Sequence, residues 1–228
     1  MESWTGYALG DFLMFSPASY FRRYELANTE LWPGQLLLLA AGLWLWWSAR
    51  RATPSTGLLV APLLAAVWAF VAGWFLYRHY AQINLAAGWF ALAFMLQAVL
   101  LLVFGVASRH RRHVLRRPVS AWHPGMLLFV YALLIHPLVG LAAGRPWQGV
   151  ELFGAAPDAT ALATLGLLLT GYRTATWPLL VIPLAWCVVS ALTYLAMGYL
   201  HGIAPLALAI AALAATMVLH HHSRPGTR

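Results

Sequence analysis

The chain has 228 residues, of which 62% are hydrophobic and only 9% are charged. Soluble domains are about 45–50% apolar and about one quarter charged, so this composition excludes an ordinary soluble domain. The net charge of +8 comes from fourteen arginines without any lysine. These arginines lie in short segments between apolar blocks, where they orient a membrane protein. We therefore do not expect nucleic acid as a partner.

We expect the first 30 residues to form a separate extracytoplasmic segment ahead of the first long apolar block. Ser16 followed by Pro17 is a favourable helix start, with serine as the N-cap and proline in the first turn. The pattern predicts a short amphipathic helix from Pro17 to about Asn28. Such a helix lies in the membrane interface or against the bundle.

Apolar blocks follow along the rest of the chain, most of them close to the roughly 20 residues that a spanning helix needs. They predict an all-α fold, a polytopic bundle of about seven transmembrane helices. This bundle is one domain over residues 31–220, and residues 221–228 form a tail. The fifth block is too short to cross about 30 Å of hydrocarbon unaided. The seven blocks are Leu31–Ser48, Gly57–Tyr77, Leu85–Val106, Pro124–Leu141, Ala159–Gly171, Pro178–Gly198 and Ile203–Leu219.

The arginines are divided unevenly between the two sides of this predicted bundle. Ten fall in the connections after the first, third and fifth blocks and in the tail, and four fall on the other side. The connector RHRRHVLRR (109–117) contributes five of the ten. The positive-inside rule then places the N-terminus outside and the C-terminus in the cytoplasm. We expect the connector to attract anionic lipid headgroups.

Several functional classes are disfavoured because the sequence lacks the residues that they need. No predicted block contains Asp, Glu, Lys or Arg, which counts against a proton- or ion-coupled carrier. The absence of lysine excludes a retinal Schiff base, and the lone cysteine, Cys187, excludes an internal disulfide. Because GxSxG, HExxH and CxxC motifs are missing, an enzyme is the least favoured of the functional hypotheses.

Three histidines fall toward the predicted outer side of the bundle. His136 lies within the fourth block, and His79 and His201 lie near the rim. If they converge, they form a site for a metal or a haem, although their spacing matches no ligand motif and no cofactor is identified. The alternative is one hydrogen-bonded structural histidine with two interfacial ones.

The stretch ELFGAAPDATALATLGLLL (151–169) is the most informative part of the sequence. Gly154 and Pro157 forbid a continuous helix, so the pattern predicts an irregular entry and a helix that opens near Asp158 or Thr160. A helix start below the membrane surface presents free N–H groups to a buried site, as in transporters with broken helices. The alternative is an ordinary helix start that Asp158 caps.

Four motifs carry a resemblance to a known family. DFLMFSP, WPGQ, LFGAAPDAT with LGLLL, and LLVIPLAWCVVSA resemble a family of bacterial multi-spanning proteins of unknown function, whose members are sometimes labelled as MFS-type permeases. The family pattern often has FGVAPCPTT, where this chain has Asp158 in place of the cysteine and Ala159 in place of the second proline. The resemblance implies the bacterial cytoplasmic membrane and no particular activity.

These observations support three hypotheses. The first is a site on the outer face that binds or transports a small solute. Arg78 and the Asp158 helix start contact an anion there, and the histidines donate hydrogen bonds or bind a metal. The second is a structural or assembly subunit, as a homo-oligomer or with another membrane protein. The third is a membrane enzyme or haem protein. The candidate ligand-binding residues are Arg78, His79, His136, Asp158, Thr160 and His201.

Overall fold

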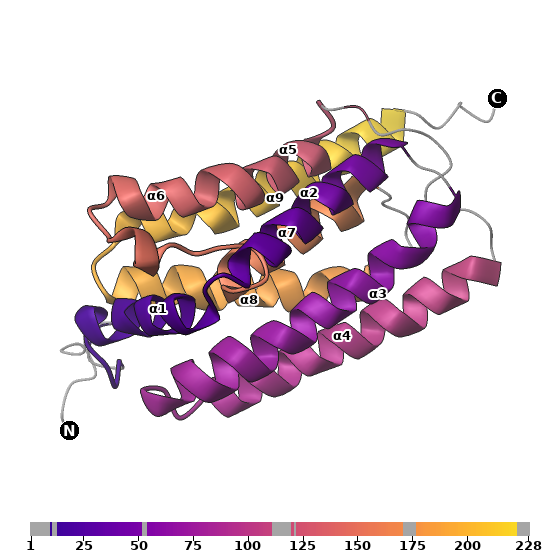
Figure 1. Ribbon diagram of the computed structural model, residues 1–228. Coiled ribbons are helices and arrows are strands. Elements are labelled where there is room, and N and C mark those ends of the chain that lie inside the picture. Colours follow the sequence, from indigo (N-terminus) through magenta and orange to yellow (C-terminus); the bar gives the residue numbers. More distant parts are fainter. Residues whose placement is uncertain are drawn as a thin grey trace, which may run out of the picture.

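The computed structural model describes residues 10, 13–51, 54–110, 120, 122–170 and 177–222. Over these residues the chain is all-α, with eight helices that pack along one another (Figure 1). The segment from Pro124 to Ala142 counts once, because α5, the π-helical η5 and α6 follow without a break. The helices are α1 (Pro17–Leu31), α2 (Gln35–Arg51), α3 (Pro54–Val71), α4 (Ala87–His110), α5 (Pro124–Val130), α6 (His136–Ala142), α7 (Pro157–Thr170), α8 (Pro178–Ala196) and α9 (Ala204–His222).

Five described helices are long and apolar enough to cross a membrane, so the prediction of about seven spans is wrong. α2 has 17 residues, about 25 Å of helix, because Leu31 belongs to α1 and a break at residues 32–34 separates the two. α7 has 14 residues, about 21 Å, so the prediction of a short fifth helix is confirmed. The five spans are Leu59–Gln82, Ala87–Gly105, Pro124–Ala142, Pro178–Ala196 and Leu200–Leu219.

The N-terminal helix begins as the sequence predicts. Pro17 is in the first turn of α1, and the Ser16 side chain accepts a hydrogen bond from the backbone N–H of Ser19. One face of α1, with Tyr20, Tyr24 and Asn28, is buried against the bundle. Figure 1 shows α1 and α2 following one another along the bundle.

The irregular entry to α7 is also confirmed. Gly154 has φ +78°, a conformation that favours glycine, and Pro157 opens the helix. Thr160 holds this turn, because its hydroxyl accepts from the Gly154 N–H at 2.9 Å and donates to the Ala156 carbonyl at 2.8 Å. After this irregular entry, α7 begins in the bundle interior, where nearly every α7 residue is buried.

α5 and α7 touch through their backbones. A Cβ atom added to Gly166 would lie 2.6 Å from the Gly125 carbonyl oxygen and 2.7 Å from the Phe129 nitrogen. Small residues permit this close approach of helices in lipid. The contact fixes α7 against α5, and with it the position of the first turn of α7.

Candidate functional site

A buried ionic cluster lies where the loop 143–156 meets α6, α7 and α8. Its centre is Glu151, which is 1% exposed. The Arg145 guanidinium donates to Glu151 Oε1 at 2.6 Å, His136 Nε2 lies 2.9 Å from Oε2, and the Tyr194 hydroxyl also donates to Oε1. We call Glu151, Arg145, His136 and Tyr194 the carboxylate cluster. With three donors, one of them a permanent cation, Glu151 is a satisfied buried anion.

The cluster keeps Glu151 ionised. Burial alone would raise the pKa of this carboxyl, but the hydrogen bond from His136 and the charge of Arg145 outweigh burial. The pKa of Glu151 therefore lies well below its ordinary value. Burial would likewise lower the pKa of Arg145, and the Glu151 charge raises it instead. Both partners thus stay charged at neutral pH.

Neighbouring elements hold the loop in this position. Asn28 of α1 donates from Nδ2 to the backbone carbonyls of Gln148 at 2.6 Å and Val150 at 2.8 Å. The Arg145 guanidinium lies over Gly140, where an added Cβ atom would be 2.6 Å from Nη2. A side chain at position 140 would displace the guanidinium. The cluster is therefore fixed by α1 on one side and by α6 on the other.

Asp158 lies in the first turn of α7 and is 2% exposed. Trp186 of α8 donates from Nε1 to its Oδ1 atom at 2.7 Å. Its Oδ2 atom has no hydrogen-bond partner among the described residues. A buried polar atom without a partner is uncommon and points to a bound water or to a function.

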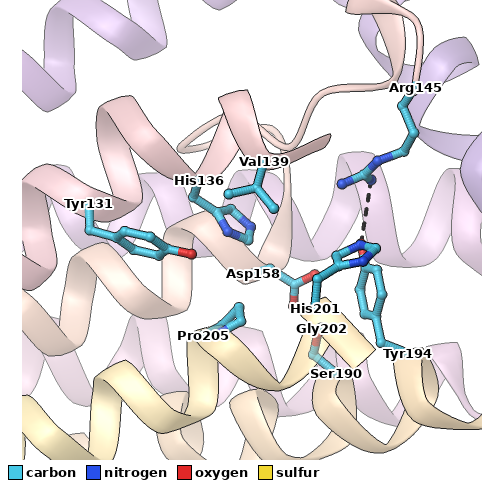
Figure 2. Close-up of a pocket in the computed structure, with 10 residues that line it drawn as sticks. All are labelled: Tyr131, His136, Val139, Arg145, Asp158, Ser190, Tyr194, His201, Gly202 and Pro205. Atoms are coloured by element: carbon cyan, nitrogen blue, oxygen red, sulfur yellow. Dashed lines mark hydrogen bonds between the residues drawn. The ribbon is translucent and has the colours of Figure 1, made fainter. Parts of the chain in front are cut away.

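Asp158 lines a small cavity, which we call the polar cavity (Figure 2). The polar cavity has about 10 Å³ of space for a water-sized occupant, room for about one water molecule. Figure 2 shows His136, Asp158 and His201 directed toward it from three different elements. The residues that line it are Tyr131, His136, Val139, Arg145, Asp158, Ser190, Tyr194, His201, Gly202 and Pro205.

The two cavity histidines also have unpartnered nitrogens. Nδ1 of His136 and Nε2 of His201 are buried without a hydrogen-bond partner in the described part of the chain. Because Nε2 of His136 faces the Glu151 carboxylate, the neutral ring carries its proton there and leaves Nδ1 as an acceptor. The polar cavity thus combines a carboxyl oxygen with an imidazole acceptor.

The structure brings together three of the six residues that sequence analysis singled out. His136, Asp158 and His201 line the polar cavity, and Thr160 supports the turn before Asp158 without lining it. Arg78 and His79 are not among the lining residues. They belong to a separate contact with Glu30 of α1, in which Arg78 donates at 2.9 Å and Nε2 of buried His79 lies 3.8 Å away. Among the described residues, no three His, Cys, Asp or Glu side chains are placed so that they could hold a metal ion together.

Sequence reasoning missed Glu151, Arg145 and Tyr194. No acid falls in a predicted block, yet Glu151 and Asp158 are both buried. The argument from uncharged blocks against proton coupling therefore missed two carboxylates inside the bundle. A usable signal was present, since Arg145 and Glu151 have opposite charges within the short connection 143–156 that follows the helix with His136.

Comparison with known proteins gives a family without an assigned activity. The model of the family of unknown function DUF6064 matches residues 18–227, which agrees with the resemblance stated above. No curated protein and no solved structure matches the chain. The MFS-type permease label receives no support from these comparisons.

Proposed function

The chain belongs to the DUF6064 family of unknown function, and we propose that it binds a small solute in the polar cavity and carries it across a bilayer, the solute being a proton. The observation that carries the proposal is the convergence of unpartnered buried atoms from Asp158, His136 and His201 on one cavity. An unpartnered buried polar atom costs about 1–3 kcal/mol. Five residues that line the polar cavity carry such an atom, since Arg145 Nε and Ser190 Oγ are also unpartnered, and this favours a site with an occupant.

The size and chemistry of the polar cavity support this solute. Space for about one water molecule excludes larger solutes in this conformation. Glu151 and Arg145 neutralise one another, which leaves Asp158, His136 and His201 as the groups that exchange protons. Chains of carboxyl and imidazole groups inside membrane bundles form proton relays in pumps and transporters.

The arrangement of the chain supports an approach from the outer face. Under the positive-inside orientation, the end of the bundle with α1 and loop 143–156 faces outward. Figure 1 shows the α7 entry reaching inward from this end. Non-helical backbone at such depth occurs where it is buried in protein or lines a wet cavity.

One observation favours the second candidate function, a structural or assembly subunit without a solute site. Glu151 is fully partnered, and the carboxylate cluster ties loop 143–156 to α6 and α8. A cluster of this kind fixes a fold whether or not anything moves through it. The two candidates differ in what they expect of Asp158, which the carboxylate cluster does not need.

Proton flux into proteoliposomes separates the two. Liposomes that hold the full chain and the pH dye pyranine are driven by a potassium diffusion potential set with valinomycin. We expect faster acidification than in protein-free liposomes, and the loss of this excess in Asp158→Asn. Glu30→Gln is the matched control, since Glu30 contacts Arg78 outside the polar cavity, and it should keep the wild-type rate. An Asp158→Asn rate equal to that of the wild type refutes the proposal, and correctly folded protein without any excess flux favours the structural subunit.

A further inference from the structure

The two buried acids near the polar cavity differ in their partners. Glu151 receives three donors, and one of them is the guanidinium of Arg145. Asp158 has only neutral donors beside it: the indole N–H of Trp186, which donates at 2.7 Å, and the hydroxyl of Ser190, which faces the same carboxyl. No ion pair of Asp158 with a basic side chain occurs among the described residues. Burial of an ionised carboxylate is costly when no cation and few donors compensate it.

The groups around Asp158 add little positive charge. Arg145 is the permanent cation at the polar cavity, and it is bonded to Glu151. Glu151 itself is a second negative charge close by, which further disfavours an ionised Asp158. The titratable and charged groups that face Asp158 from the packed elements are Tyr20 and Tyr24 of α1, Tyr80 after η3 (Ala72–His79), Tyr131 of η5 (Tyr131–Ile135), His136 of α6, Arg145 and Glu151 of the loop, Cys187 and Tyr194 of α8, and His201 of η8 (Leu200–Ile203).

His136 provides the site to which a proton on Asp158 can move. Its Nε2 is bonded to the Glu151 carboxylate, and its Nδ1 is an unpartnered acceptor at the polar cavity. The cavity has room for one water, which would bridge Asp158 Oδ2 and His136 Nδ1. The Glu151 carboxylate then stabilises the imidazolium that forms.

We infer that Asp158 carries the mobile proton of the polar cavity and exchanges it with His136, while Glu151 is a positioning residue that stays ionised. The inference rests on the proposed function only for the role of this proton in transport. The proton exchange between Asp158 and His136 does not itself require transport. In the step, the Asp158 O–H bond breaks, the bridging water passes a proton on, and an N–H bond forms at Nδ1. The products are a carboxylate and an imidazolium, so one proton and the total charge are conserved.

Infrared difference spectroscopy tests the inference without any transport. The full-length protein in mild detergent is titrated from acidic to alkaline pH, and the carbonyl stretch of a protonated carboxylic acid is followed. We expect such a band at neutral pH, and we expect Asp158→Asn to lack it and Glu30→Gln to keep it. Trp186→Phe removes the hydrogen bond to Oδ1 and should shift the band frequency while the carboxyl group remains, which covers a failure of Asp158→Asn to fold.

His136→Gln tests the exchange partner. Glutamine still donates to Glu151 but cannot take up a proton, so the Asp158 band should persist to a more alkaline pH than in the wild type. A band that is the same in wild type and Asp158→Asn, or an unchanged titration in His136→Gln, overturns the inference. A band without proton flux refutes the proposed function alone, and flux without the band refutes the inference alone.

Discussion

Removal of the Arg145 guanidinium tests how strongly the carboxylate cluster holds the fold. In Arg145→Met, Glu151 stays buried with two of its three donors, His136 and Tyr194. The Arg145 and Glu151 side chains are 10% and 1% exposed, so solvent screens their interaction little. Breaking a buried ion pair costs about 3–5 kcal/mol, and the two remaining donors favour the lower end. We expect a loss of about 3 kcal/mol, roughly a 100-fold change in the folding equilibrium.

Reversible unfolding in mixed micelles of a mild detergent and dodecyl sulfate, followed by circular dichroism, measures this change. The double variant Arg145→Met/Glu151→Met removes both charges and should recover most of the loss. Arg22→Met is the control, because Arg22 is 61% exposed in its pair with Glu25 and should cost less than about 1 kcal/mol. The reasoning fails if Arg145→Met costs no more than the control, or if the double variant is no more stable than Arg145→Met.

Three further expectations follow from single features of the structure. Because the pKa of folded Glu151 lies below its ordinary value of 4.5, its contribution to stability is full at neutral pH and is lost as the pH falls below that value. A titration of the unfolding free energy should show this loss, and Glu151→Gln should flatten it. Gly166→Ala should cost about 1–3 kcal/mol, because its Cβ meets the α5 backbone, whereas Gly73→Ala should cost little, since nothing lies within 4 Å of it. Equal losses in the two glycine variants would contradict the close contact of α5 and α7. A cysteine in place of Ser120 should react with a membrane-impermeant maleimide only from the cytoplasmic side, and a cysteine in place of Trp147 only from the outside. Both positions are exposed, and native Cys187 is buried and should not react. Labelling of both from the same side would overturn the proposed orientation.

The features that depend on nearby residues were predictable. Ser16 and Pro17 predict the start of α1, and Gly154 and Pro157 predict the irregular entry to α7. Both signals act within a few residues, through a cap or through a backbone conformation. Hydropathy likewise predicted the helical bundle, because lipid requires long apolar helices. It overestimated the spans where helix breaks shorten an apolar block, as between α1 and α2.

The carboxylate cluster was not predictable in the same way. Glu151 meets Tyr194 across 43 positions of the chain, and Asn28 reaches Val150 across 122. Such contacts depend on how the helices are arranged, which hydropathy does not contain. His136 and Asp158 were chosen individually as an intramembrane histidine and a helix start. Their common cavity followed only from the packing of α6, α7 and α8.

The short helix and the polar cluster have a common physical origin. Because α7 begins inside the bundle, the backbone of the entry before it must find hydrogen-bond partners within the protein. Asn28 and Thr160 satisfy part of it, and the space beside the first turn of α7 is open to polar side chains from α6 and α8. A helix that crossed the whole bundle would fill this space with apolar side chains. The departure from a regular span at residues 150–157 is thus what makes room for Asp158 in the interior, as functional sites in otherwise consistent folds often do.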